Sequence, residues 1–321
     1  MRIVVHGVGG VGGTILAALC DAGLDAVGIA RGAMLEAIRA QGLTLRAPER
    51  TVHARPHCVA DPSDLRFGPD DIVLLTMKSQ DTWPALLALR DAGLREQPVF
   101  CLQNGVANER AATRLFPNVH GATVMMPATY LVPGEVAVTA GPRFGMFDIG
   151  RFPGGTDADD GRLAQAFEAA NIAAFVMPDV MASKYGKLLM NLGNIVQAVL
   201  GPGVDAGDLT KRVRAEAKDV YRAAGIAWKN VGMDDPRRDV MRPAPVPGVS
   251  RQGGSTTQSL LRGTGSVETD WLNGEIAFLA RMHGVAAPLN ARLTDLGAEV
   301  LRKGVRPGGM TRADLEAWLA G

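Results

Sequence analysis

Seven residues into the chain, directly after the apolar residues 3–5, glycines recur with the spacing G-x-G-x-x-G. The loop reads Gly7, Val8, Gly9, Gly10, Val11 and Gly12. In such a loop the first glycine allows a tight turn, the second lets a pyrophosphate approach the backbone, and the third lets a helix pack closely on a strand. Residues 14–20 read as that helix, and its N-terminal N–H groups would attract phosphate. The spacing predicts a dinucleotide-binding loop, with a purely structural turn as the alternative.

Arg31 directly follows the second predicted strand, residues 26–30. An acidic residue at this position binds the ribose 2′-hydroxyl of NAD, whereas an arginine accommodates the 2′-phosphate of NADP. The nearest acidic residues, Asp25 and Glu36, lie outside the strand tip. The sequence predicts NADP(H), and the alternative for Arg31 is a solvated surface side chain.

Two further strands end in polar residues where open α/β sheets bind ligands. Lys78 closes the strand predicted at 72–77, and Asn104 follows the strand predicted at 98–102. At neighbouring carboxyl ends, these side chains would flank a nicotinamide or its phosphates. Either residue could instead belong to a turn, especially the Asn-Gly pair at 104–105.

A helical pattern in the second half of the chain carries Lys187, Asn191 and Asn194 at positions i, i+4 and i+7. On one continuous helix these residues share a face, and the remaining faces are rich in leucine. A polar stripe on so apolar a helix is costly to bury unless its groups find partners. The alternatives are that the stripe faces solvent or that Asn191 bonds a neighbouring loop.

A second polar group of residues lies at 255–274. Ser255 is predicted to cap a helix at its N-terminus. Glu268 and Asp270 point in different directions on a helix, so they need not act as a paired acid and base. By itself, Glu268 would be a surface carboxylate.

The elements that must position these residues alternate between strand and helix in the first half of the chain. Strands are predicted at 2–6, 26–30, 72–77, 98–102, near 121–125 and at 173–177, and helices at 13–22, 32–41, 81–94, 107–115 and 162–170. This alternation predicts a parallel doubly wound sheet. Residues 127–150 read as a hairpin added to the edge of that sheet.

Helical periodicity dominates after residue 180, with helices predicted at 181–200, 208–227, 256–284, 288–301 and 311–319. The sequence thus predicts an α/β fold with two domains, a Rossmann-type domain at 1–178 and an all-helical domain at 179–321. The proline-rich residues 242–248 are predicted as a loop inside the helical domain. Its long apolar helices would suit a homodimer, although core burial explains them equally well.

Composition excludes several classes of partner. The 321 residues include 47% hydrophobic and 21% charged side chains with a net charge of +1, which favours neither nucleic acid nor an anionic membrane. No apolar run approaches the roughly 18 residues of a membrane span. The start of the chain does not read as a secretory signal, and the 3 cysteines and 5 histidines show no metal-ligand spacing. These features predict a cytoplasmic protein without a metal.

Taken in order, the motifs resemble those of the ketopantoate reductase (2-dehydropantoate 2-reductase) family over most of the chain. The matching motifs are the glycine loop, Arg31, T-x-K ending at Lys78, Q-N-G at 103–105, K-L-x-x-N at 187–191 and E-x-D-x-x-N-G at 268–274. The resemblance implies NADPH-dependent reduction of a 2-keto acid to a 2-hydroxy acid, with 2-dehydropantoate and pantothenate biosynthesis as the family's own case. It implies a small-molecule substrate.

The resemblance also implies roles for single residues. Lys187 matches the family's catalytic lysine, which stabilises the developing alkoxide and donates a proton to it. Asn191 matches an asparagine that contacts substrate and orients the lysine, and Glu268 a carboxylate that binds substrate and cofactor-side hydroxyls. The implied substrate-binding set is Asn104, Lys187, Asn191, Asn194, Thr256 and Glu268. Beyond the glycine loop, the implied cofactor-binding set is Arg31, Lys78, Asn104, Ala140 and Glu268.

Two departures from the family pattern fall in the substrate half. The family's second asparagine is replaced by Ile195, with Asn194 one residue earlier, and Leu260 replaces an aspartate. Thr256 keeps a hydroxyl where the family has serine. The alternatives are therefore a reductase of a different branched 2-keto acid, or a non-catalytic NADP(H)-binding sensor.

Overall fold

A computed structural model describes residues 1–250, 253–263 and 265–320. The chain forms two compact units. The first contains Met1–Asn104, Asn108–Lys184 and Met233–Ser250, and the second contains Gly105–Ala107, Tyr185–Gly232 and Arg251–Gly321. Each unit is described by itself below.

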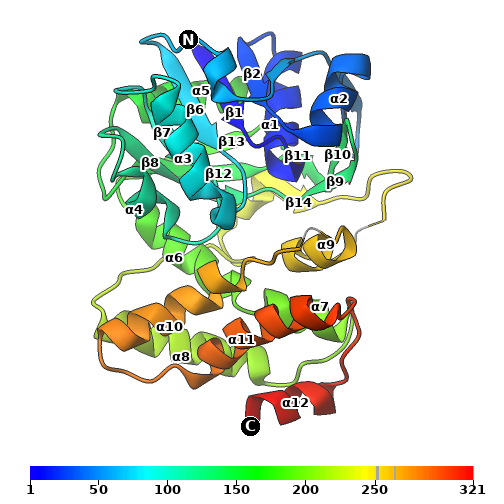
Figure 1. The fold of residues 1–321 in the computed structure, drawn as a ribbon, viewed down its shortest axis with the longest axis vertical. Helices are drawn as coiled ribbons and strands as arrows, with labels where there is room; N and C mark the ends of the chain where they lie inside the picture. The colour runs from blue at the N-terminus through cyan, green and yellow to red at the C-terminus, as the bar shows by residue number, and fades with distance from the viewer. Residues whose placement is uncertain (251–252, 264, 321) are drawn as a thin grey trace. The chain divides into compact units, whose positions relative to one another are not determined.

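An eight-stranded sheet forms the centre of the first unit (Figure 1). Its strands, in spatial order, are β13 (Ala173–Val176), β12 (Met146–Arg151), β8 (Val119–Met125), β7 (Val99–Cys101), β6 (Asp71–Leu75), β1 (Arg2–His6), β2 (Ala26–Ile29) and β5 (His57–Val59). The six strands from β8 to β5 run parallel, and β12 is antiparallel to β8. The helices of this unit are α1 (Gly10–Asp21), α2 (Gly32–Gln41), α3 (Thr82–Asp91), α4 (Asn108–Ala112) and α5 (Ala158–Ala169). The predicted doubly wound sheet is confirmed.

The central strands are apolar along their whole length. Ile3, Val4 and Val5 of β1 are fully buried, and so are residues 72–75 of β6. Parallel strands covered on both faces require such continuous apolar runs, whereas half-exposed strands alternate. The chain order reverses between β1 and β6, which is where open α/β sheets bind their ligands.

A second sheet of four strands packs against α1. Its spatial order is β4 (Thr51–Ala54), β3 (Leu43–Arg46), β10 (Glu135–Val138) and β9 (Ala128–Val132). A Cβ at Gly13 of α1 would lie only 2.9 Å from Val136 Cγ1, so glycine allows the close approach. The hairpin expected within 127–150 exists as β9 and β10, but its placement on the edge of the main sheet was wrong because β10 pairs with β3.

The proline-rich region belongs to the first unit, not to the helical half where the sequence placed it. There β14 (Met241–Pro243) pairs with β11 (Ala140–Pro142) in a small antiparallel sheet. The adjoining η3 (Pro236–Val240) carries Arg237, which binds the buried carboxylate of Asp148 on β12 at 2.5 Å and that of Asp235 at 2.6 Å. The ion pair between Arg237 and Asp148 thus holds residues 236–243 against the main sheet.

The second unit is helical, as predicted. Its elements are α7 (Asn194–Leu200), α8 (Leu209–Ala223), α9 (Ser255–Leu261), η4 (Thr269–Trp271), α10 (Asn273–Met282), α11 (Pro288–Lys303) and α12 (Arg312–Ala320), and α6 (Val180–Asn191) begins in the first unit and ends in the second. Two predicted helices are each broken in the structure. The helix expected at 181–200 divides at Leu192 and Gly193, and the one expected at 256–284 becomes α9, η4 and α10.

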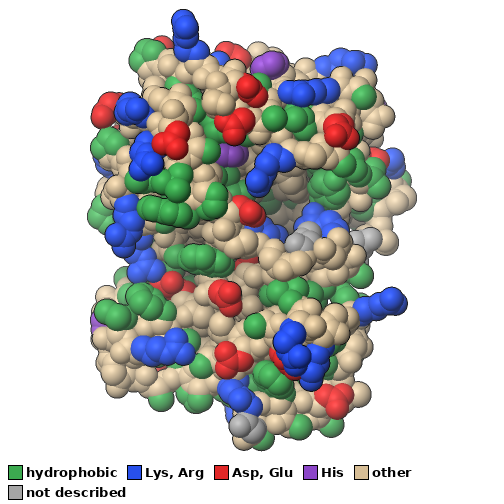
Figure 2. Space-filling view, viewed as in Figure 1, with side chains coloured by type: hydrophobic (Ala, Val, Ile, Leu, Met, Phe, Trp, Pro, Cys, Tyr) green, Lys and Arg blue, Asp and Glu red, His purple; other side chains and the backbone are tan. Residues whose placement is uncertain are grey.

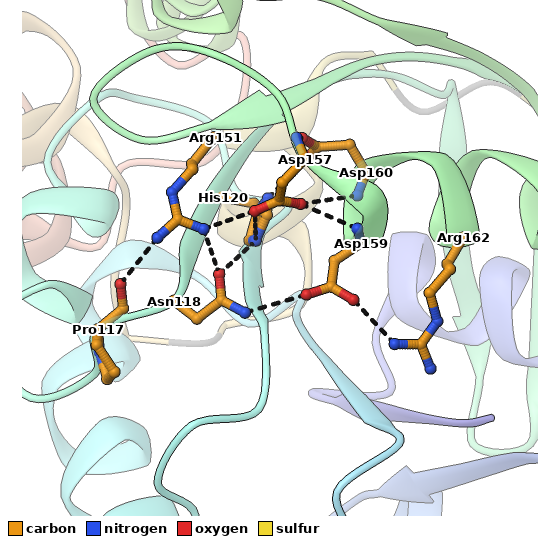
Figure 3. Close-up of polar contacts among 8 residues, drawn as sticks. All are labelled: Pro117, Asn118, His120, Arg151, Asp157, Asp159, Asp160 and Arg162. Atoms are coloured by element: carbon orange, nitrogen blue, oxygen red, sulfur yellow. Dashed lines mark hydrogen bonds and ion pairs between the residues drawn. The ribbon is translucent and has the colours of Figure 1, made fainter.

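A partly buried polar network lies at the amino-terminal edge of the main sheet (Figure 3). Asn118 accepts a hydrogen bond from Arg151 at 2.6 Å and donates to Asp159 at 3.1 Å, which fixes the orientation of its amide. The Nε2 atom of His120 lies 3.0 Å from the oxygen of that amide, and its Nδ1 atom lies 2.7 Å from the Asp160 carboxylate. Both ring nitrogens of His120 therefore lie within hydrogen-bond distance of an oxygen atom of the network.

The same network contains a group whose ligand atoms lie within 4.8 Å of one another, as in a metal site: His120, Asp157 and Asp159. Each of these side chains already has hydrogen-bond partners within the network. Partial burial works to raise the pKa of Asp157, but Arg151, His120 and two backbone N–H groups outweigh it and hold that pKa below its ordinary value. We therefore interpret the group as a structural network that caps α5.

On the face drawn in Figure 2, basic and acidic side chains are interspersed and form no large patch of one sign. Within the described residues, no helix is both long and apolar enough to cross a membrane.

Candidate active site

The glycine loop joins β1 to α1 at the carboxyl edge of the main sheet. Gly7 has a φ of +106°, which a residue with a side chain rarely adopts. A Cβ at Gly12 would lie 2.3 Å from the Gly7 carbonyl oxygen, so only glycine lets the helix start this close to the turn. At Gly9 a Cβ would meet no atom within 4 Å. The loop thus has an open side at the second glycine, where a pyrophosphate would approach.

Thr76, just after β6, secures this loop from the neighbouring strand. Its hydroxyl donates to the carbonyl of His6 at 3.0 Å or that of Gly7 at 2.8 Å. No side chain caps the N-terminus of α1, whose N-cap residue is Gly9. The first N–H groups of the helix and the dipole therefore face the open side of the loop, which fits the phosphates of a dinucleotide.

The other predicted cofactor residues of the first unit lie on adjoining segments of the same edge. Arg31 follows β2, has an exposed side chain and lies 4.0 Å from Asp81 of η2 (Ser79–Asp81). Lys78 immediately precedes η2, and the Ser79 hydroxyl donates to the Asn104 carbonyl at 3.3 Å. The structure therefore brings together the segments that carry Arg31, Lys78 and Asn104. Ala140 is buried in β11, paired with Pro243 of β14.

Buried polar residues hold the loop after β7, and of these only Gln103 lies in a motif named from the sequence. Asn108 donates to the Ser79 hydroxyl at 3.1 Å and to the Asn104 carbonyl at 3.2 Å, and it accepts from Thr82 at 2.8 Å. The Gln103 amide donates to Thr82 at 3.0 Å. These bonds fix the Lys78 and Asn104 segments against each other. In the sequence, the Gln-Asn-Gly motif at 103–105 is the feature that points to this loop.

Lys184 and Glu109 form a buried ion pair in the first unit. The Lys184 ammonium also donates to the carbonyls of Cys101, Gln103 and Ala122 at 3.0–3.4 Å. It thereby connects the first half of α6 to the carboxyl end of β7 and to the middle of β8. The pair was not predicted from the sequence, because a lysine one turn before Lys187 has the pattern of a solvated helix face.

His6 ends β1 directly before the glycine loop, and its Nδ1 atom is buried with no hydrogen-bond partner among the described residues. Burial, and then the positive charge of Arg31, lower the pKa of His6 to about 4. The ring is therefore neutral near pH 7. A neutral imidazole keeps one acceptor nitrogen next to the loop.

The predicted substrate residues of the second unit lie on α6, α7 and α9 and directly before η4. Lys187 and Asn191 are on α6 one turn apart, as predicted, and Asn191 is only 7% exposed with its Nδ2 atom unpaired among the described residues. Asn194 begins α7, so the expected single stripe through i+7 was wrong: the helix breaks after Asn191. Ile195 is buried in the core.

Glu268 precedes η4 and is buried at 6% exposure, contrary to the surface position expected for it by itself. Thr256 is buried on α9, which packs against α7. The predicted Ser255 cap was wrong. Gly254 is the N-cap residue of α9 and makes no side-chain bond, while the Ser255 carbonyl accepts from the Ser259 hydroxyl at 3.0 Å.

Two family models match the chain consecutively. "Ketopantoate reductase PanE/ApbA" matches residues 3–154, and "Ketopantoate reductase PanE/ApbA C terminal" matches residues 179–300. Similar curated proteins include the 2-dehydropantoate 2-reductases of Caulobacter vibrioides, 30% identical over 92% of this chain and 97% of that protein, and of Halobacterium salinarum, 29% identical over the same shares. This chain belongs to the ketopantoate reductase PanE/ApbA family.

Solved structures agree with this membership. A PanE/ApbA family ketopantoate reductase from Ralstonia eutropha is 30% identical, superposes with a TM-score of 0.77, and the match covers 95% of this chain and 99% of that one. A D-mandelate dehydrogenase bound to NADH and anilino(oxo)acetate has a TM-score of 0.78 over 95% and 99% of the chains; at 21% identity it shows the shared fold alone. As a ketopantoate reductase family member, the chain is an oxidoreductase acting on a CH–OH donor.

Proposed function

We propose that this chain reduces 2-dehydropantoate to pantoate with NADPH as the hydride donor. One observation carries the proposal: curated relatives named 2-dehydropantoate 2-reductase match nearly the whole chain at 25–30% identity, through both the sheet and the helical unit. The K-L-x-x-N and E-x-D-x-x-N-G motifs support it, since both are intact here. We keep a cytoplasmic location and a homodimer as expectations of the same proposal.

The glycine loop and α1 would hold the cofactor's pyrophosphate, and Arg31 its 2′-phosphate. The geometry supports the fit, because a Cβ at Gly9 would occupy otherwise open space and α1 lacks a side-chain cap. Asn104, Lys78 and Ala140 would line the cofactor site. When bound, the reduced nicotinamide supplies a hydride.

Lys187 would serve as the general acid. Hydride arriving at the 2-keto carbon leaves negative charge on oxygen, and an ammonium stabilises that charge before it transfers a proton. Asn191 has a buried Nδ2 atom with no hydrogen-bond partner among the residues that the structure describes, which suits a donor for a bound keto acid. Glu268, Asn194, Asn104 and Thr256 complete the proposed substrate set.

The test follows NADPH absorbance during incubation with 2-dehydropantoate, beside NADH and a panel of branched 2-keto acids. We expect NADPH-dependent turnover of 2-dehydropantoate. Turnover of another keto acid alone would show that Ile195 and Leu260 accompany a different substrate preference. Cofactor binding without turnover of any keto acid would favour the sensor alternative.

Lys187→Ala tests the acid directly. We expect kcat to fall by about 10²–10⁴-fold, the usual loss for a general acid, with little change in NADPH affinity measured by fluorescence. Lys211→Ala removes an exposed lysine of α8 and serves as the matched control. Undiminished turnover by Lys187→Ala would refute the assignment.

A further inference from the structure

A buried side-chain amide joins two of the segments that carry the proposed substrate residues. Asn273, the first residue of α10, is 1% exposed. Its Nδ2 atom donates to the Leu192 carbonyl at 3.1 Å and to Asn290 Oδ1 at 3.1 Å. Both donor hydrogens of the amide are therefore used, and both acceptors are fully enclosed groups of the second unit.

Asn290 and Glu216 hold this amide in place. The Nδ2 atom of Asn290 donates to the Val213 carbonyl at 3.1 Å and to Glu216 at 2.9 Å, so its oxygen must face Asn273. The Glu216 carboxylate also accepts the backbone N–H groups of Leu289 and Asn290 at 3.0 and 2.9 Å. Glu216 of α8 thus caps α11, whose own N-cap residue, Ala287, cannot. In Figure 1, α8, α10 and α11 lie side by side.

One end of the Asn273 bridge lies next to Asn191, and the other lies five residues, one short helical turn, after Glu268. Leu192 directly follows Asn191 at the break between α6 and α7, where a helical hydrogen-bond ladder no longer satisfies its carbonyl. Asn273 follows η4, which Glu268 precedes. The bridge therefore connects the backbone next to Asn191 to the start of α10, five residues after Glu268.

Helix α11 also packs closely against η4. A Cβ at Gly297 of α11 would lie 2.0 Å from the Thr269 hydroxyl oxygen, and Thr269 is buried. Helix α11 therefore packs closely against η4, while Asn273, two residues after η4, bonds to the carbonyl at the helix break. Buried polar networks whose members are all satisfied give rigidity.

We propose that Asn273 is a positioning residue that sets the spacing between Asn191 and Glu268 for the 2-keto acid. This inference rests on the proposed function of that site. Its alternative is a merely structural role, in which loss of the bridge lowers stability alone. The two roles differ in whether substrate kinetics change more than stability does.

The experiment compares Asn273→Ala with Glu216→Ala in the full chain. Glu216→Ala breaks the same network at α11 but leaves the Asn273 bond to Leu192 possible. For both variants we would measure Tm, NADPH affinity by fluorescence, kcat and KM for 2-dehydropantoate, and hydrogen exchange of the peptide 188–200. Asn273→Asp, which keeps the shape but loses both donors, provides a second variant if Asn273→Ala folds poorly.

We expect Asn273→Ala to lower kcat/KM by about 10- to 100-fold, the cost of a small misplacement of reacting groups, with unchanged NADPH affinity. Hydrogen exchange in 188–200 should rise. Glu216→Ala should lower Tm at least as much and change kcat/KM far less. Equal kinetic losses at equal losses of Tm would overturn the inference.

The proposed function fails separately, if the wild-type chain turns over no 2-keto acid. In that case hydrogen exchange tests whether Asn273 holds the helix break. Unchanged exchange of residues 188–200 in Asn273→Ala would overturn this structural role as well. Faster exchange confined to that variant would retain the bridge and reassign only the ligand that the site takes.

Discussion

At the scale of single residues, the proposed preference for NADPH depends on one exposed arginine. Arg31 lies 4.0 Å from Asp81, a distance that leaves its guanidinium able to turn toward a 2′-phosphate. Charge-assisted hydrogen bonds contribute about 1.5–3 kcal/mol each, so Arg31→Ala should raise the Kd for NADPH by about 10- to 100-fold. The Kd for NADH should stay the same, since NADH has no 2′-phosphate. Equal weakening of both cofactors in fluorescence titrations would contradict this assignment.

His6 predicts a pH dependence of stability. Its pKa of about 4 in the folded chain lies below the ordinary 6.5, so the folded state resists the proton that the unfolded state accepts. The stabilisation is complete above pH 6.5 and is lost as the pH falls from 6.5 toward 4, amounting to about 3 kcal/mol. Urea unfolding across this range should show the loss. His6→Gln should remove most of the slope, and an unchanged slope would assign it to other groups.

At the scale of elements, Gly186 inside α6 lets the backbone at Lys229 pass close to the helix. A Cβ at Gly186 would lie 1.7 Å from the Lys229 carbonyl oxygen. Alanine normally stabilises a helix interior by about 1 kcal/mol over glycine, but here the overlap should dominate. We expect Gly186→Ala to lower Tm and, because Lys187 is the next residue, kcat as well.

Gly161 in α5 is the matched control for this substitution. A Cβ at Gly161 would meet no atom within 4 Å, so Gly161→Ala should leave Tm unchanged or raise it. If thermal unfolding gave the same shift for both variants, the close approach of Lys229 would not be what requires glycine at 186.

Elements of the fold could be predicted wherever the determining pattern is local. For β1, β6 and the glycine turn, a stretch of about ten residues contains the whole pattern that predicts the element. Strands β3 and β4 also carried a local signal, since buried and more exposed side chains alternate through both, and the sequence analysis overlooked it. The pairing of β14 with β11 could not be predicted, because its partners are about a hundred residues apart in the chain.

The same limit applies to the candidate site. Lys187 and Asn191 were predicted to share a helix face and do so because one turn separates them. Asn194 was placed wrongly, because the break at Leu192 is supported by Asn273, eighty-one residues away. The burial of Glu268 likewise depends on packing between distant segments. Motif spacing selected the candidate residues, and contacts between distant segments determine where the structure places them.

At the scale of the whole molecule, the chain crosses between its two units several times. Residues 105–107 leave the first unit and return, and residues 233–250 come back to it after the first half of the helical unit. The predicted domain 1–178 therefore lacks two stretches of its own unit. Among the residues left out are Lys184 and Arg237.

Each of these basic residues pairs with a buried carboxylate that lies within residues 1–178, so a fragment of those residues would contain the carboxylate without its partner. Glu109 is fully buried against Lys184, and Asp148 is 2% exposed against Arg237. Removing one partner of a buried ion pair costs about 3–5 kcal/mol, because the remaining charge loses its compensation without regaining water. Two such losses approach the whole stability of an ordinary domain, about 5–15 kcal/mol.

We therefore expect the isolated fragment 1–178 to lack a cooperative thermal transition, although it contains the entire glycine loop and most of the main sheet. The double substitution Glu109→Gln with Asp148→Asn replaces the two unpaired carboxylates of the fragment by amides. It should restore part of the transition, because neutral amides cost far less to bury than unpaired charges. Circular dichroism during heating would compare the two fragments with the full chain. A cooperative transition of the unsubstituted fragment near the Tm of the full chain would show that residues 1–178 fold without these pairs.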